Sequence, residues 1–142
     1  MIRLERRFHD QIVQQAFEEL PNEACGLIAA RDGAPVRLFP IRNADESPTT
    51  YRFDARDHFL AEQEMEDEGL ELVAIYHSHT HTEAYPSPTD RNRAYWEVEG
   101  ERAPIFPGTM YLIVSLADRE DPVLRAFRIG ETEVTEEEVR IE

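Results

Sequence analysis

Residues 76–90 read YHSHTHTEAYPSPTD and place three histidines, two serines and an aspartate within fifteen positions. They overlap the run LELVAIYHSH at 70–79, whose apolar and β-branched residues predict a buried strand. Side chains two positions apart on a strand share a face, so we expect His77 and His79 to point to the same side as Val73 and Ile75. Two imidazoles on one face supply half of a tetrahedral zinc site, although an isolated His-x-His is more commonly a pair of surface histidines.

The Ser-Pro-Thr-Asp that closes this stretch predicts the first turn of a helix. Ser87 fits the N-cap, Pro88 the first helical position and Asp90 the third, and capping alone would account for the serine and the aspartate. The short preceding loop also returns the Asp90 carboxylate to the strand end that carries both imidazoles. Two histidines and one aspartate leave a fourth ligand position for water, which is the arrangement of a catalytic zinc site.

Length and composition predict one soluble globular domain, 1–142. No apolar run approaches the roughly 18 residues of a membrane span, and the charged N-terminal sequence MIRLERRFHDQ lacks the apolar stretch of a signal peptide. The single cysteine, Cys25, excludes an internal disulfide and fits a reducing compartment. Together these features predict a cytoplasmic protein.

The charge of the chain bears on its partners and its source. The net charge of −15 argues against nucleic acid or an anionic membrane as a partner, because both are polyanions. Every one of the 15 basic residues is arginine. An acidic surface without lysine predicts a halophilic source, in which concentrated salt screens the self-repulsion of the chain. A GC-rich genome that favours arginine codons is the alternative explanation.

Helical and strand patterns alternate along the chain and predict an α/β or α+β fold, with a mixed sheet flanked by helices. Asp32-Gly33 predicts a hairpin turn, Asp54 a helix N-cap and Gly69 a helix end. Helices are expected at 10–20, 55–68 and 89–99, and strands at 24–30, 35–41, 51–53, 70–79, 109–116 and 123–129, with one or two more within 131–142.

Hydrolysis at such a zinc site needs a base, and Glu23 in PNEACGLI is a candidate far upstream of the histidines. On its own, a glutamate between a helix and a strand is ordinarily a solvated residue. The whole set nevertheless fits the pattern Glu…His-x-His-x7-Ser-x2-Asp, which resembles the signature of the JAMM (MPN+) metalloprotease domain. The matching residues are Glu23, His77, His79, Ser87 and Asp90.

This resemblance extends over essentially the whole chain. It includes the surroundings of the motif residues, in EACGLI at 23–28, IYHSHT at 75–80 and YLIVSL at 111–116. The stretches NADESPTTYRFD and HTEAYPSPTD make the chain similar to the short prokaryotic members that release cysteine from the C-terminus of a ubiquitin-like sulfur-carrier protein. The substrate implied is therefore a ubiquitin-like or sulfur-carrier protein, cleaved after its C-terminal Gly-Gly.

The resemblance also implies a fold and a mechanism. The fold would be a curved mixed sheet with helices on either side, as in the cytidine-deaminase-like folds. One zinc ion per chain would be held by His77, His79 and Asp90. Zinc would bring the pKa of a water near 7, and Glu23 would take its proton and deliver it to the leaving amine. Ser87 would help to stabilise the oxyanion.

Two other functions remain open on the sequence. Some members of this family are catalytically inactive scaffold or binding modules of the MPN type, although the complete motif disfavours that alternative here. Two histidines and a carboxylate also form the facial triad of iron oxygenases, which would not need Glu23 as a base. His81 lies outside the ligand set, and Cys25 is expected to be a buried structural thiol rather than a nucleophile. The sequence does not determine the oligomeric state or the identity of the carrier.

Overall fold

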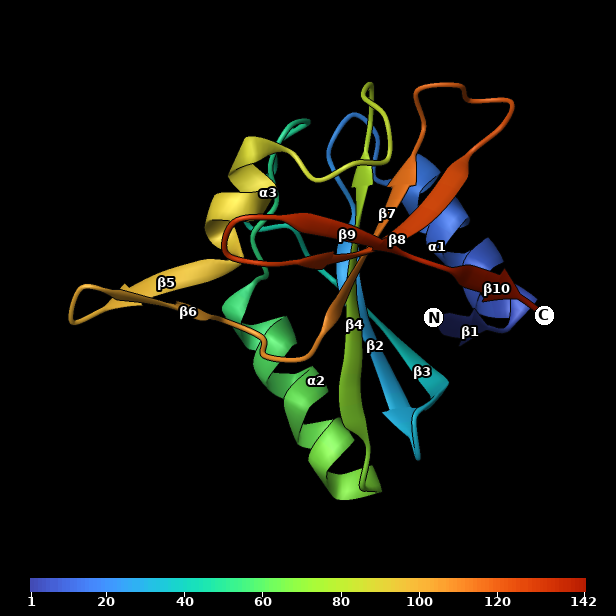
Figure 1. Ribbon diagram of the computed structural model, residues 1–142. Coiled ribbons are helices and arrows are strands. Elements are labelled where there is room, and N and C mark those ends of the chain that lie inside the picture. The colour runs from blue at the N-terminus through green and yellow to red at the C-terminus, as the bar shows by residue number, and fades with distance from the viewer.

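A six-stranded mixed sheet forms the centre of the molecule (Figure 1). The structure is a computed structural model that describes residues 1–142. β4 and β7 run parallel, and all other neighbouring strands of this sheet are antiparallel. In spatial order the strands are β3 (Ala34–Ile41), β2 (Cys25–Arg31), β4 (Glu71–His79), β7 (Met110–Ser115), β8 (Val123–Ile129) and β9 (Val134–Glu137).

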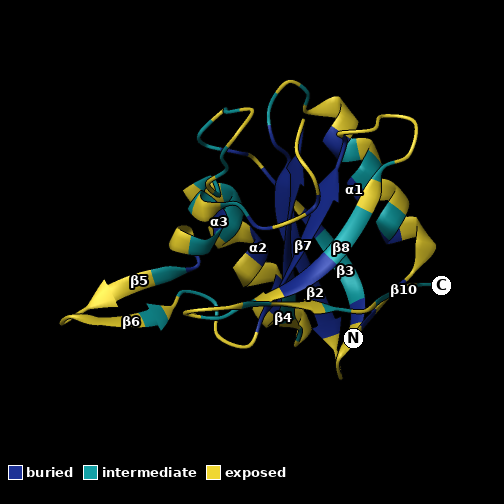
Figure 2. Cartoon of the chain, turned by 45° about the horizontal axis from the view of Figure 1, so that its top comes forward, coloured by how far each residue is buried: buried dark blue, intermediate teal, exposed yellow.

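Helices cover both faces of this sheet and confirm the predicted fold class. On one face, α1 (Arg6–Glu18) packs together with the small parallel pair of β1 (Ile2–Leu4) and β10 (Val139–Ile141). The other face packs against α2 (Ala55–Glu68) and the end of α3 (Pro88–Arg93). Buried residues are concentrated in the central strands between these layers (Figure 2). None of the three helices is both long and apolar enough to cross a membrane.

Several local signals in the sequence act as predicted. Asp32 and Gly33 both have positive φ in the turn that joins β2 to β3. Asp54 caps α2, since its side chain accepts a hydrogen bond from the amide of Asp57. Gly69 ends α2 in the left-handed conformation, which a glycine adopts without steric cost.

The helix predicted over 89–99 is wrong beyond its first half. α3 ends at Arg93, and the chain then forms an antiparallel hairpin whose first strand, β5 (Tyr95–Val98), lies within the expected helix and whose second is β6 (Glu101–Pro104). Glu99 and Gly100 both have positive φ, and such two-residue turns match the twist of hairpin strands. The hairpin projects from the body of the molecule as an arm (Figure 1). The aromatic and β-branched residues of YWEV favour this strand over a helix.

Two smaller expectations also need correction. α1 begins at Arg6 instead of residue 10. Val73 does not share the face of the histidines. The register of β4 with β2 shifts between Ile28 and Ala29, so the alternation of faces is interrupted at Val73, which packs against the α1 side of the sheet.

Candidate functional site

The end of β4 carries the two histidines of the motif close together. His77 is fully buried and His79 is 4% exposed. Their Nε2 atoms lie 3.2 Å apart, so both rings converge on one point. β4 ends there beside its parallel neighbour β7, and the carboxyl ends of parallel strands are where open sheets commonly bind ligands.

Asp90 reaches the same point from the first turn of α3. Ser87 is the N-cap: its Oγ accepts a hydrogen bond from the Asp90 amide, and its own amide donates to Asp90 Oδ2, both at 3.0 Å. Asp90 Oδ2 also lies 3.0 Å from the Nε2 atom of both His77 and His79. The capping box therefore holds the carboxylate against the two imidazoles.

These three side chains can together hold a metal ion. Ligand atoms bonded to a tetrahedral ion at about 2.0–2.1 Å stand roughly 3.3 Å from one another. The observed separations of 3.0–3.2 Å are close to that value. His79 Nδ1 lies 2.7 Å from the carbonyl oxygen of Glu83 and donates to it, which leaves Nε2 with its lone pair. Burial by itself would raise the pKa of Asp90, but its imidazole and amide neighbours hold that pKa well below the ordinary range. The carboxylate is therefore ionised, as a ligand must be.

Glu23 is a buried carboxylate next to this group, not a solvated helix-end residue. Its side chain is 3% exposed, and Oε1 has no hydrogen-bond partner. Burial raises its pKa to about 8, while the charges of His79 and Arg93 act to lower it and that of Asp90 to raise it. A carboxyl group with this pKa can accept or release a proton near neutral pH, which is what a general base and acid requires.

The backbone of Glu23 is held by residues that the sequence analysis did not single out. Ser78, between the two histidines but on the opposite face of β4, accepts a hydrogen bond from the Ala24 amide at 2.7 Å. Buried Asn43 donates to the carbonyl oxygen of Glu23 at 3.1 Å, and the Glu23 amide donates to the carbonyl of Ser47. These contacts fix the base candidate relative to β4. In the sequence, the only indication that these two residues support the site was their position: Ser78 lies inside the motif, and Asn43 begins NADESPTTYRFD.

Tyr51, from the same stretch, packs directly on a ligand candidate. Its ring stacks on His77 with centroids 4.4 Å apart and an interplanar angle of 22°. His77 Nδ1 is buried and has no hydrogen-bond partner. The orientation of His77 therefore depends on stacking, whereas that of His79 depends on its hydrogen bond to Glu83.

The remaining candidates do not contribute ligand atoms to this group. His81 is exposed and is not among the side chains that converge on the metal-binding position. Cys25 is buried, and its thiol donates to the carbonyl of Ile41 at 3.3 Å. Burial raises the pKa of Cys25, so the thiol is inert as a nucleophile. His58 is half-buried against the rings of Phe53 and Phe106.

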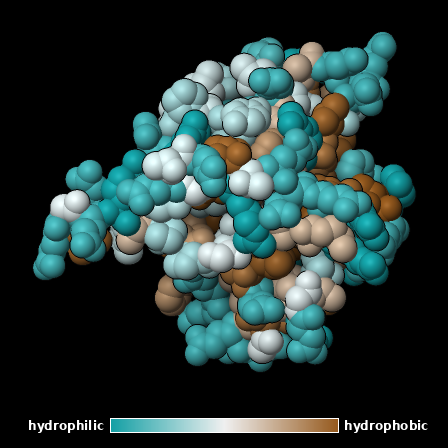
Figure 3. Space-filling view, viewed as in Figure 1, coloured by the Kyte–Doolittle hydropathy of each residue, from teal (hydrophilic) through white to brown (hydrophobic).

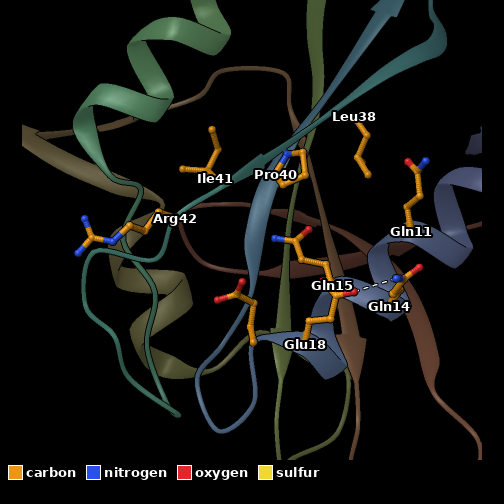
Figure 4. A pocket seen from close by; sticks show the side chains of 9 residues that line it. Gln11, Gln14, Gln15, Glu18, Leu38, Pro40, Ile41 and Arg42 are labelled. Atoms are coloured by element: carbon orange, nitrogen blue, oxygen red, sulfur yellow. Dashed lines mark hydrogen bonds between the residues drawn. The ribbon is translucent and has the colours of Figure 1, made fainter.

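Two hollows differ in their relation to the site. A cavity of about 290 Å³ adjoins it, between α2, α3 and the segment after β6, and has Asp90 and Tyr51 in its wall. A larger hollow of about 550 Å³ lies between α1 and β3 (Figure 4). Its wall is mostly amides and carboxylates, among them Gln14 and Glu18, which are hydrogen-bonded at 2.8 Å. It contains none of the five motif residues, so the smaller cavity is the one relevant to chemistry.

The chain belongs to the family described as prokaryotic homologs of the JAB domain, whose model matches residues 5–130. The JAMM resemblance of the sequence is thereby confirmed. The class of enzyme is that of the JAMM hydrolases, which act on peptide or isopeptide bonds.

Named relatives support this class. The chain is 40% identical to a CysO-cysteine peptidase of Mycobacterium tuberculosis over 132 residues, which are 92% of this chain and 84% of the relative. It is 32% identical to a desampylase of Haloferax volcanii over 113 residues, 75% of this chain and 74% of the relative.

Solved structures support the fold. A protein of Desulfitobacterium hafniense, studied in solution, has a TM-score of 0.85 and 34% identity, with 100% of this chain and 93% of that chain covered. A JAB1/MPN domain protein of Archaeoglobus fulgidus has a TM-score of 0.61 and 17% identity, with 99% and 97% covered. At that identity the second likeness concerns the fold alone, and it confirms the predicted JAMM/MPN fold.

Proposed function

We propose that this chain is a zinc-dependent peptidase or isopeptidase that hydrolyses the bond after the C-terminal Gly-Gly of a ubiquitin-like or sulfur-carrier protein. The observation that carries the proposal is the Glu23 carboxylate, which is buried beside His77, His79 and Asp90 with Oε1 unpartnered. A buried carboxylate with a free oxygen is costly unless a ligand uses it. The relatives named a CysO-cysteine peptidase and a desampylase support the same class of substrate.

Each residue of the site has a separate role in the proposed hydrolysis. His77, His79 and Asp90 would hold one zinc ion per chain, which supplies a Lewis acid for the scissile carbonyl and a water of lowered pKa. Glu23 accepts the proton of the attacking water and delivers it to the leaving amine. The Ser87 hydroxyl accepts from the Asp90 amide and keeps its own hydrogen for donation to the developing oxyanion.

The confined position of these groups supports a Gly-Gly substrate. The three ligand candidates and Glu23 are each at most 7% exposed, so only a narrow, extended backbone can bring a carbonyl to them. Glycine has no Cβ to collide with the surrounding chain. The net charge of −15 also disfavours acidic tails and tolerates neutral or basic ones.

The two alternatives explain less of the site. An inactive scaffold has no use for a buried, unpartnered Glu23, whose desolvation destabilises the fold. An iron oxygenase would share the two histidines and Asp90 but would likewise leave Glu23 without a role. The metal content of the purified protein distinguishes zinc from iron.

Intact-mass measurement on a carrier conjugate tests the proposal. The zinc-loaded protein is incubated with a small ubiquitin-like protein extended beyond Gly-Gly, and with the same protein in which Ala-Ala replaces Gly-Gly. We expect release of the extension from the first substrate only, with the cut directly after the second glycine. Survival of the Gly-Gly conjugate, together with cleavage of unrelated unfolded peptides, would identify a general peptidase and refute the proposal.

A further inference from the structure

Arg93 lies one helical turn beyond Asp90 on α3. Residues three apart on a helix share a face, with Cβ atoms about 5–6 Å apart. Both side chains contribute to the wall of the 290 Å³ cavity that adjoins the metal-binding position. The charge of Arg93 also acts on the pKa of Glu23, which places the guanidinium near the base candidate.

The guanidinium of Arg93 is anchored on one side and free on the other. Its Nη1 atom donates to Asp45 Oδ2 at 2.7 Å and to the carbonyl oxygen of Tyr51 at 2.9 Å. Its Nε and Nη2 atoms make no hydrogen bond within the chain, and the side chain is 48% exposed. A guanidinium held in this way can present two parallel N–H donors, which match the two oxygens of a carboxylate.

Arg93 and Arg52, which both line the cavity, share a single carboxylate partner. Asp45 pairs with Arg93 and also with Arg52, whose Nη2 lies 3.3 Å from Asp45 Oδ1. One carboxylate therefore faces two guanidiniums, and this cluster retains about one positive charge. Within a chain of net charge −15, such a local excess next to the site favours an anionic group of the substrate.

Most of the remaining cavity wall is apolar, although Arg52 also lines it. Phe53, Phe106 and Tyr111 line it together with Ile105, and His58 packs between the rings of Phe53 and Phe106. The cavity thus offers a small apolar compartment with a guanidinium at one side. A free amino acid has the same two features, a side chain and an α-carboxylate.

We propose that this cavity receives the residue that leaves on hydrolysis, and that Arg93 binds its free α-carboxylate. Arg93 then selects a leaving residue with a free α-carboxylate, a group that an isopeptide conjugate of a lysine side chain lacks at that position. This inference rests on the proposed function. Water adds to the carbonyl of the second glycine and the C–N bond breaks, so the products are a carrier carboxylate and a free amino acid.

Bond lengths make this contact feasible. The α-carboxylate carbon of the leaving residue lies roughly 3–4 Å from the scissile carbonyl carbon, because only the nitrogen and the α-carbon stand between them. A scissile carbonyl beside Asp90 therefore brings the carboxylate within reach of a guanidinium one turn further along α3. A lysine isopeptide has only a methylene group at that position, so it leaves the donors of Arg93 without a partner.

A pair of conjugates that differ in one group tests the contact. Both are carriers that end in Gly-Gly plus one amino acid, with a free carboxylate in one and a C-terminal amide in the other. We expect the zinc-loaded protein to cleave the acid at least about tenfold faster in kcat/KM, since a charge-assisted bidentate pair contributes that much or more. Arg93→Gln should abolish this preference by slowing the acid and leaving the amide nearly unchanged, and Arg93→Lys should lie between.

Arg91→Gln is the matched control, because Arg91 lies on the same helix and donates instead to the carbonyl of Thr132. It should keep the wild-type preference. Equal rates on acid and amide in the wild type, or an equal loss on both in Arg93→Gln, would overturn the inference and leave Arg93 a structural residue. The affinity of zinc-loaded Glu23→Gln for both conjugates, measured by calorimetry, is a second readout. Tighter binding of the acid supports the carboxylate contact even without turnover, whereas equal binding overturns it.

Failure of the wild type to cleave either conjugate would instead refute the proposed function.

Discussion

The segment of residues 71–93 and the arm of residues 95–104 follow one another in the chain but differ in their surroundings. The first comprises β4, a loop and α3, and its motif side chains are almost fully buried. The second, the β5–β6 hairpin, is exposed along nearly its whole length (Figure 2). In the space-filling view the tip of the arm is largely hydrophilic (Figure 3), in keeping with Glu97, Glu99 and Glu101. The same short stretch of chain thus contains polar residues that are buried among several partners and polar residues that are exposed to solvent.

This difference shows that buried hydrogen-bond partners determine the position of a polar side chain. At the site, the Asp90 carboxylate meets two imidazoles and an amide, and the loss of any partner would leave a buried polar group unsatisfied. On the arm, the charged side chains keep their contact with water, so no single contact decides their position. We therefore expect substitutions to have large effects at the site and small effects on the arm.

The largest effect is expected from loss of a ligand. The wild type should hold about one zinc ion per chain, and the variants His77→Ala and Asp90→Ala should lose most of it, because the two remaining ligands do not compensate for the missing donor. Hydrolysis of the Gly-Gly conjugate should fall to background. Metal analysis after gel filtration measures the first effect, and intact mass the second.

His81→Ala is the control for this experiment, since His81 is exposed and outside the converging group. It should keep both its zinc and its activity. Full zinc occupancy in a variant that lacks both His77 and His79 would show that the ion binds elsewhere. The burial of His77 and His79 would then have no connection with metal binding.

The second effect concerns Glu23, which separates chemistry from metal binding. Glu23→Gln should keep its zinc and lose at least about a hundredfold in hydrolysis, because the base is removed while the ligands remain. Wild-type turnover in this variant would mean that Glu23 is only a buried structural residue.

The same variant gives a stability prediction for the metal-free protein. The pKa of Glu23 is raised from 4.5 to about 8, so the folded state binds a proton more tightly than the unfolded state does. The stability contributed by this group is complete below pH 4.5 and is lost as the pH rises to about 8. At pH 8–9, Glu23→Gln should therefore be more stable than the wild type by at least about 1 kcal/mol. Urea unfolding of both proteins at pH 5 and pH 8.5 measures the difference, and an unchanged difference between the two values would contradict it.

The residues of the site differ in how far the sequence alone predicts their positions. The convergence of His77, His79 and Asp90 was predictable because strand alternation and helix capping are local rules with fixed spacing. The burial of Glu23 was not, because it depends on contacts across long stretches of chain: Asn43 donates to the carbonyl oxygen of Glu23, and the neighbouring Ala24 amide donates to Ser78. The family resemblance, not the local pattern, identified Glu23 as a candidate.

The predictions of secondary structure are wrong where local sequence patterns and tertiary contacts favour different conformations. Residues 94–99 contain a helical spacing of apolar side chains, but the pairing of Tyr95–Val98 with Glu101–Pro104 and the turn at Glu99 and Gly100 prevail. The bulge near Val73 has no signature within β4 itself, because it reflects the register with β2. The halophilic source remains a prediction, since the fold requires only that charges lie outside and does not determine their number.

The smallest effect is expected on the arm. Trp96 is 56% exposed on β5, so Trp96→Ser removes little packing and should change the free energy of unfolding by less than about 0.5 kcal/mol. Ile113, fully buried on β7 beside His77, is the contrasting position, and Ile113→Ala should cost about 2–5 kcal/mol through the cavity it leaves. Urea unfolding measures both, and zinc content should remain near one ion per chain in Trp96→Ser. A loss of more than about 1 kcal/mol in Trp96→Ser would show that the arm is packed in solution, through self-association or contact with the body. The distinction between a constrained site and an unconstrained arm would then have to be abandoned.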